Sequence, residues 1–113
     1  MHETSIVQSL LKQIAQMAEG QSVHRVKSIR LRIGELSGVD ISLFETAFDA
    51  MKRNTICRDA VIDAVSVKAR WTCKDCGKEI SEGKALQCSE CKSPSVLLEG
   101  TELILESVQW EVA

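Results

Sequence analysis

The sequence predicts an α+β fold in which two helices pack on a three-stranded sheet, with a zinc-ribbon-like module inserted into the chain. Three observations carry this prediction. Two segments place apolar residues three and four positions apart, as in amphipathic helices. Three others alternate or are rich in β-branched residues, as in strands. Four of the five cysteines form two Cys-x-x-Cys pairs, and 113 residues suffice for one domain with a small appendage.

The first helix is expected over residues 4–18, where the apolar residues form one stripe. Ser5 and Gln8 have the spacing of a capping box near its start. Gly20 is a suitable stop, because glycine commonly ends a helix. This start leaves three residues, including His2, in front of the helix.

A strand is predicted over residues 26–33, with Ile29, Leu31 and Ile33 on one side and polar residues on the other. A turn follows at 34–38.

The second helix is expected next, ending near Asn54. Ser42 with Glu45 forms a good capping box, and Asp40 is a second candidate for the cap. Its apolar stripe consists of Leu43, Phe44, Ala47, Phe48 and Met51.

Two further strands are predicted over residues 61–70 and 101–112, where β-branched and other apolar residues are frequent. The segment 73–92 between them differs in character, with four cysteines, four lysines and few large apolar residues. It cannot build a hydrophobic core of its own. A structureless segment of this length inside a small domain would be unusual, so a metal is expected to organise it.

The cysteine pattern is Cys73-x-x-Cys76, an eleven-residue connector, and Cys88-x-x-Cys91. Zinc takes four thiolates tetrahedrally, and the connector is long enough to bring the two turns together as a short hairpin. Gly77 tolerates the positive φ that such a turn often needs. A redox dithiol and a disulfide pair are the alternatives. A closed site of four thiolates leaves no open coordination position, so this zinc would be structural and not catalytic.

The sequence does not predict an enzyme. It holds only two histidines, no glycine-rich phosphate loop, no nucleophile elbow and no Cys-His pair in a fixed context. We interpret His24 as an ordinary surface histidine and Cys57 as a partly buried small hydrophobic residue.

Charge and composition exclude further classes. A formal net charge of −2 and 4% aromatic residues oppose nucleic-acid binding. No run of 18 apolar residues exists that could span a membrane. The opening Met1-His2-Glu3 does not resemble a signal peptide, so we expect a cytoplasmic protein.

The N-terminus offers a second kind of metal site. The Met1 amine and the His2 amide nitrogen would close a five-membered chelate ring, and the amide and the imidazole Nδ1 a six-membered one. Nitrogen donors in a plane suit Ni(II) or Cu(II) and not zinc. These chelate rings alone are a weak signal, and without further information we interpret His2 as an ordinary terminal residue.

Taken together, these residues resemble the HypA/HybF family of hydrogenase-maturation proteins. The similarity lies in Met1-His2-Glu3 before a helix, in Ile33-Gly34-Glu35-Leu36-Ser37, and in the late Cys73-x-x-Cys76 and Cys88-x-x-Cys91 pairs. It covers essentially the whole chain, in the same order of elements.

The resemblance implies a nickel metallochaperone. The nickel site of the family maps onto His2 and the adjacent backbone, with Glu3 matching the motif. Its structural zinc maps onto Cys73, Cys76, Cys88 and Cys91. In some members an acid after the Gly-Glu turn also reaches the nickel, and Asp40 is the matching candidate here.

The resemblance also implies partners. A GTPase of HypB type would help to pass nickel to the large subunit of [NiFe]-hydrogenase, and some members also serve urease. We expect the GTPase to contact helix 4–18 and the Gly34–Asp40 turn. The chain itself would be a monomer or a homodimer.

We therefore expect a nickel-binding domain over 1–70 and 97–113 and a zinc-binding module over 71–96. The alternative is a zinc-ribbon module that binds nucleic acid or another protein. The lysines around the cysteines permit that alternative, whereas the overall charge opposes it.

Overall fold

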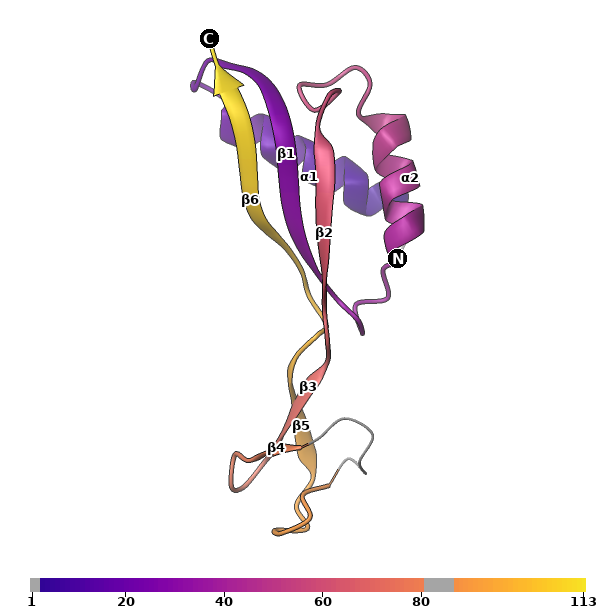
Figure 1. The fold of residues 1–113 in the computed structure, drawn as a ribbon, viewed down its shortest axis with the longest axis vertical. Helices are drawn as coiled ribbons and strands as arrows, with labels where there is room; N and C mark the ends of the chain where they lie inside the picture. The colour runs from indigo at the N-terminus through magenta and orange to yellow at the C-terminus, as the bar shows by residue number, and fades with distance from the viewer. Residues whose placement is uncertain (1–2, 81–86) are drawn as a thin grey trace.

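A computed structural model of the chain describes residues 3–80 and 87–113. The molecule is elongated, with extents of 58 × 26 × 17 Å and a radius of gyration of 18.1 Å. A single compact domain of this length would have a radius of gyration of about 13 Å. The excess arises because two small sheets are stacked end to end (Figure 1). We call residues 3–67 and 103–113 the helical lobe, 70–80 and 87–99 the cysteine lobe, and 68–69 with 100–102 the neck.

The sheet of the helical lobe has the strand order β2-β1-β6. The central strand β1 (Val23–Gly34) pairs in parallel with β2 (Val61–Val67) and antiparallel with β6 (Leu103–Val112). A parallel pair needs a crossover, and the helix α2 (Ile41–Met51) supplies it. This confirms the three-stranded sheet that the sequence predicts.

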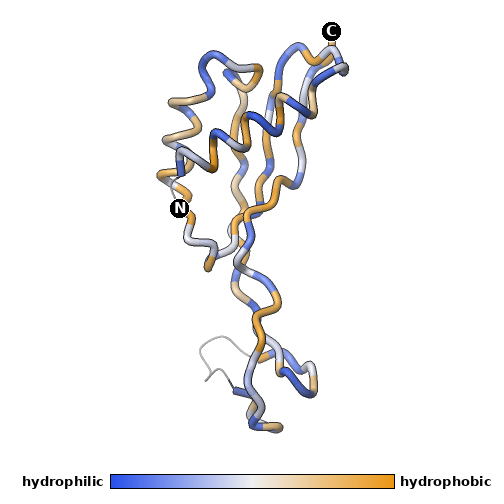
Figure 2. Tube along the Cα trace, turned by 180° about the vertical axis from the view of Figure 1, so that it is seen from behind, coloured by the Kyte–Doolittle hydropathy of each residue, from blue (hydrophilic) through white to orange (hydrophobic). Residues whose placement is uncertain are grey.

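Both helices cover one face of this sheet. Helix α1 (Glu3–Ala18) crosses it diagonally, in front of the strands in Figure 2, and α2 lies beside β2. The predicted alternation of β1 is confirmed, because Ile29, Leu31 and Ile33 are at most 1% exposed. Burying each such side chain contributes about 1.5–3 kcal/mol. The buried core consists of Val7, Leu10, Ile14, Val26, Ile29, Leu31, Ile33, Phe44, Phe48, Cys57 and Ala60.

The start of α1 differs from the prediction. The helix begins at Glu3, so two residues and not three precede it. Ser5 lies inside the first turn, and the predicted Ser5–Gln8 capping box therefore does not begin the helix. An acidic residue in the first turn stabilises the exposed N–H groups there, and Glu3 supplies one. Gly20 has a φ of +75° just after the helix, which confirms it as the stop.

The cap of α2 is Asp40, the second candidate, and not Ser42. Asp40 has extended backbone angles, and its Oδ1 accepts a hydrogen bond from the Leu43 amide at 3.0 Å. Because the chain becomes helical at Ile41, Ser42 is already within the first turn. The helix ends at Met51, three residues before the predicted end near Asn54.

The cysteine lobe holds a second three-stranded sheet of order β4-β3-β5. The strands are β3 (Arg70–Cys73), β4 (Glu79–Ile80) and β5 (Ser95–Glu99). The strand predicted over 61–70 is in fact β2, which ends at Val67, followed by β3 after a break in the neck. The last strand begins at Leu103, two residues later than predicted, and β5 lies in a segment where no strand was predicted.

One ion-pair cluster ties the three strands of the cysteine lobe together. The Arg70 guanidinium in β3 contacts Glu79 of β4 and Glu99 of β5, each at 2.7 Å. These pairs are exposed, so they fix the arrangement of strands more than they stabilise it.

The turn after β1 holds the neck by backbone hydrogen bonds. The amides of Gly34 and Leu36 donate to the carbonyls of Glu102 and Gly100, both at 2.8 Å. On the other side, the Glu35 amide donates to the Val67 carbonyl at 2.8 Å. The Glu35 carboxylate also accepts from the Ala69 amide at 2.8 Å. The Gly-Glu turn therefore binds both chain segments that lead to the cysteine lobe.

Glycine is required where these segments cross. A Cβ on Gly34 would lie 2.2 Å from the Gly100 carbonyl oxygen, and a Cβ on Gly100 would lie 2.6 Å from Ala69 Cα. Gly100 also has a φ of +115°, a conformation that other residues rarely adopt. Close backbone contact thus explains the glycine at position 100 in the neck and the glycine at position 34, which packs against it at the end of β1.

Candidate functional site

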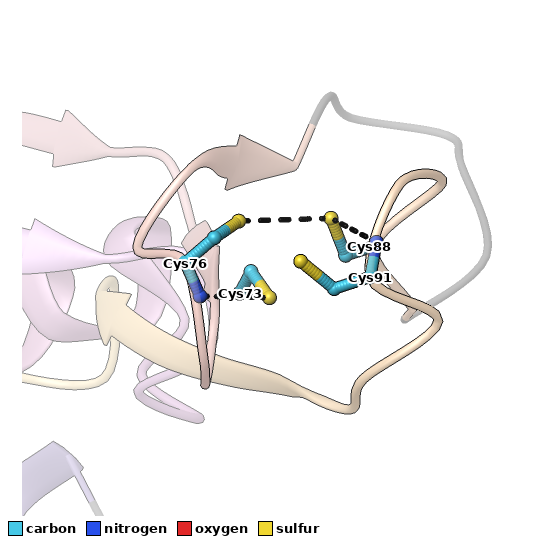
Figure 3. A group of neighbouring side chains, drawn as sticks. All are labelled: Cys73, Cys76, Cys88 and Cys91. Carbon is cyan, nitrogen blue, oxygen red and sulfur yellow. Dashed lines mark hydrogen bonds between the residues drawn. The ribbon is translucent and has the colours of Figure 1, made fainter.

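The four paired cysteines meet at one point of the cysteine lobe. The sulfur atoms of Cys73, Cys76, Cys88 and Cys91 all lie within 4.8 Å of one another, and Figure 3 shows them pointing toward a common centre. The Cys76 and Cys88 sulfurs are 3.9 Å apart. Zinc–sulfur bonds of about 2.3 Å in a tetrahedron place the sulfurs about 3.8 Å apart. The four thiols therefore fit the ligand set of one zinc ion.

The two Cys-x-x-Cys turns have the same backbone geometry. In the first, the amides of Asp75 and Cys76 point at the Cys73 sulfur at 3.4 Å, and Gly77 donates to the Cys73 carbonyl at 3.1 Å. Gly77 has the expected positive φ, +74°.

The second turn repeats this pattern. The Cys91 amide points at the Cys88 sulfur at 3.5 Å, and Lys92 donates to the Cys88 carbonyl at 2.9 Å. Lys92 follows the second Cys-x-x-Cys pair as Gly77 follows the first, and it also has a positive φ, +60°. Amide donors aimed at a sulfur stabilise a thiolate, which is the form that binds metal.

Contacts between residues other than the cysteines also join the two turns. Lys78, just after the first turn, forms an ion pair with Glu90 of the second at 2.8 Å. Ser93 donates a hydrogen bond to the Asp75 carboxylate. The Lys74 amide donates to the Pro94 carbonyl at 3.1 Å. Sequence reasoning noted lysines near the cysteines but missed these specific pairs, because no local spacing indicates which residues meet across the connector.

The thiols influence one another strongly. Hydrogen bonds from the backbone, that of Cys76 first, lower the pKa of Cys73 to about 7. The neighbouring Cys76 sulfur raises the pKa of Cys91 to about 12, and desolvation adds to the shift. Four sulfurs this close therefore do not all ionise on their own, whereas a bound dication favours the thiolate form of each.

A second cluster of candidate residues lies at the start of α1, where the two helices begin side by side. The Asp40 amide donates to the Glu3 carboxylate at 3.4 Å. Asp40 uses Oδ1 to cap α2, and a carboxylate has a second oxygen for another partner. Met1 and His2 lie outside the described residues. The structure thus brings Glu3 and Asp40 together, next to the position where His2 joins the chain.

The remaining singled-out residues have ordinary surroundings. Cys57 is 1% exposed within the core, more deeply buried than we predicted, and burial raises the pKa of its thiol. His24 is exposed at the far end of the helical lobe, as predicted. Among the described residues, no helix is both long and apolar enough to cross a membrane.

Comparison with known proteins identifies the family. A family model described as hydrogenase/urease nickel incorporation, metallochaperone, hypA matches residues 1–110. The chain belongs to the HypA family. It is 34% identical to the hydrogenase/urease maturation factor HypA of Helicobacter pylori, over 96% of this chain and 97% of that protein. It is 38% identical to the hydrogenase maturation factor HypA of Aquifex aeolicus, over 99% of both chains.

Solved structures of HypA proteins share the fold. A solution structure of a HypA protein matches with a TM-score of 0.81 and 31% identity, over 100% of this chain and 98% of that one. The solution structure of the nickel metallochaperone HypA from Helicobacter pylori matches with a TM-score of 0.74 and 31% identity, over all of both chains. The predicted resemblance to the HypA family is therefore confirmed.

The family assignment settles the functional class. HypA proteins are maturation factors and nickel metallochaperones, so this chain is not an enzyme, as the sequence predicted. The assignment also favours the metallochaperone over the alternative of a zinc-ribbon module for nucleic acid.

Proposed function

We propose that this HypA protein binds one Ni(II) ion at Met1-His2-Glu3 and, with a GTPase of HypB type, passes it to the large subunit of [NiFe]-hydrogenase in the cytoplasm. The observation that carries this proposal is the pairing of Glu3 with Asp40 where α1 begins. The backbone nitrogens and the His2 imidazole are the donors that suit nickel in a plane.

The two carboxylates support a cation at this end of the molecule. Glu3 and Asp40 are both acidic, they are in contact with each other, and Glu3 directly follows Met1-His2 in the sequence. Each also accepts a hydrogen bond from a backbone amide at or near Asp40, which holds it in place. A site at the end of the chain leaves the core intact when the ion arrives or departs.

Nickel titration of the untagged chain tests the proposal. We expect one planar nickel per chain, lost in His2→Ala and severely weakened when one residue is added before Met1, because the amine then leaves the chelate ring. Asp40→Asn separates two roles, since asparagine caps a helix as well as aspartate but carries no charge. It should weaken nickel binding and leave the unfolding midpoint unchanged. Equal affinity in all four proteins would place the site elsewhere.

We further propose that Cys73, Cys76, Cys88 and Cys91 hold one structural zinc ion. The support is the distance of 3.9 Å between two of the sulfurs and the amide donors of both turns. Among the described residues of the cysteine lobe, only Cys73 and Cys88 are buried, so the lobe has no apolar core. The metal would supply the folding energy that this composition lacks.

Metal analysis with single cysteine variants tests the zinc site. Cys91→Ser should release zinc and unfold the cysteine lobe, whereas Cys57→Ser, the matched control, should keep one zinc per chain. Zinc-free purified protein, or equal zinc content in both variants, would contradict the proposal.

A further inference from the structure

We propose that a hollow between the α2–β2 connection and the start of β1 is an anion site that binds a phosphate group. It lies at the end of the helical lobe away from the N-terminus and the cysteine lobe (Figure 1). Helix α2, 11 residues or about 16 Å long, separates this end from Asp40, so the inference is independent of the proposed nickel site. The hollow, which we call the arginine hollow, is lined by His24, Arg25, Arg53, Asn54, Thr55, Ile56 and Arg58.

The first observation is the charge of the lining. The arginine hollow has a volume of about 470 Å³, which is in the range of sites for small ligands. Three of its lining residues are arginines and none is acidic, although 16 residues of the chain are Asp or Glu. A guanidinium binds carboxylates and phosphates through two parallel N–H donors. The lining therefore favours an anionic occupant.

The second observation is that positive charge in the hollow is not fully neutralised. Within the part of the chain that the structure describes, Arg53 forms no ion pair, whereas each of the other five arginines contacts a carboxylate. Arg58 contacts only Asp59, at 3.8 Å. Arg25 is held more closely, by Glu111 at 2.9 Å. Arg53 and Arg58 are thus the two cations that an incoming anion would meet.

The third observation is that the frame of the hollow is held in place by hydrogen bonds. The Thr55 amide donates to the Lys52 carbonyl and the Arg58 amide to the Thr55 carbonyl, both at 3.1 Å. The Thr55 hydroxyl also donates to the Lys52 carbonyl, at 2.7 Å. The Val26 amide of β1 donates to the Ile56 carbonyl at 3.0 Å, which ties the two sides of the hollow together. A frame that is ordered before binding lowers the entropy cost of holding a ligand.

The arrangement of donors favours phosphate over carboxylate. Arg25 comes from β1, whereas Arg53 and Arg58 come from the connection, so the donors approach from two elements. The Asn54 amide adds donors on the same connection. A phosphate group carries a charge of about −1.5 to −2 near neutral pH and has three strong acceptor oxygens, whereas a carboxylate has one charge and two oxygens in a plane. The phosphate could be the free ion or the phosphoryl group of a small molecule.

NMR titration of the full chain tests the proposal, with inorganic phosphate and methyl phosphate as probes at constant low ionic strength. We expect saturable shifts of the amides of residues 52–60 with a dissociation constant in the millimolar range. Saturation by either probe supports the site. Tighter binding of inorganic phosphate would indicate the free ion as the ligand, and tighter binding of methyl phosphate would indicate a phosphoryl group on an organic molecule.

Three variants give effects of different sign. Arg53→Gln should weaken phosphate binding at least fivefold. Arg30→Gln is the matched control, because it removes the same charge from an arginine outside the hollow, and it should change binding less than twofold. Asp59→Asn should strengthen binding at least twofold, because Asp59 competes for Arg25 at 3.9 Å and for Arg58 at 3.8 Å.

Three results would overturn the inference. The first is that phosphate shifts the amides of residues 52–60 no more than chloride does. The second is that Arg53→Gln and Arg30→Gln weaken binding equally, since the effect would then be one of total charge. The third is that a glutamate-rich peptide binds the hollow more tightly than both phosphate probes, since the surface would then serve an acidic protein segment.

Discussion

Replacing Gly34 by alanine is the most direct test of how the two lobes are joined. The new Cβ would lie 2.2 Å from the Gly100 oxygen and 2.8 Å from the Thr101 nitrogen, both backbone atoms that cannot rotate away. The neck must open, and the bonds from Gly34 to Glu102 and from Leu36 to Gly100 would lengthen or break. Losing two hydrogen bonds and leaving their groups unsatisfied costs about 2 kcal/mol each.

Alanine also restricts the unfolded chain, which returns up to about 1 kcal/mol. We therefore expect Gly34→Ala to lower the free energy of unfolding by about 3 kcal/mol. With a urea dependence of about 1–2 kcal/mol per molar, the midpoint should fall by about 2 M.

Urea unfolding followed by tryptophan fluorescence can separate the lobes. Trp71 lies in β3 and Trp110 in β6, and the chain has no other tryptophan. Gly38→Ala is the matched control, because Gly38 has a φ of +81° but its Cβ would meet nothing within 4 Å. It should cost about 1 kcal/mol through backbone strain alone. A Gly34→Ala protein no less stable than Gly38→Ala would refute the close crossing in the neck.

Three further predictions follow from single contacts. Asp40→Ala should destabilise the chain by about 1 kcal/mol through loss of the α2 cap, while Asp40→Asn should not, as urea midpoints can show. Lys92→Gly should stabilise the zinc-loaded chain by about 1 kcal/mol in thermal unfolding, because Lys92 has a φ of +60°; an unchanged or lower midpoint would argue against this turn geometry. Burial raises the pKa of Cys57, so its reactive thiolate should appear only at a pH above the ordinary value for cysteine. Alkylation of Cys57 at pH 8 should be slow in the native chain and fast in urea, and equal rates in the two conditions would contradict the burial of this thiol.

The elements of the helical lobe could be predicted because each has a local signal. The alternation of Ile29, Leu31 and Ile33 reflects one buried face, and the spacing of apolar residues in α1 reflects another. Their ends were harder to predict. Ser5 and Gln8 have the spacing of a capping box, yet the helix already includes Glu3, so this local motif did not mark where the helix begins.

For the cysteine lobe, the sequence predicted the metal site but not the strands around it. Four thiols at fixed spacing predict a metal site from sequence alone, and their sulfurs do meet. The strand β5 was missed because its pairing with β3 depends on contacts across the connector and not on its own pattern. In the same way, the bond of Glu35 to the Ala69 amide joins residues far apart in sequence, and only the fold reveals it.

The neck has a consequence for the thermodynamics of the sheet above it. Because β2 and β6 flank β1, segment 68–102 is the connection between two outer strands of one sheet. Without an ordered cysteine lobe, that connection is a flexible loop of about 35 residues, whose closure entropy costs on the order of 3 kcal/mol. A folded lobe brings Ala69 and Gly100 together in advance, so the loop is already short when β6 pairs with β1. An ion held by four sulfurs in one lobe would therefore change how readily a strand of the other lobe detaches, without any contact between the ion and that strand.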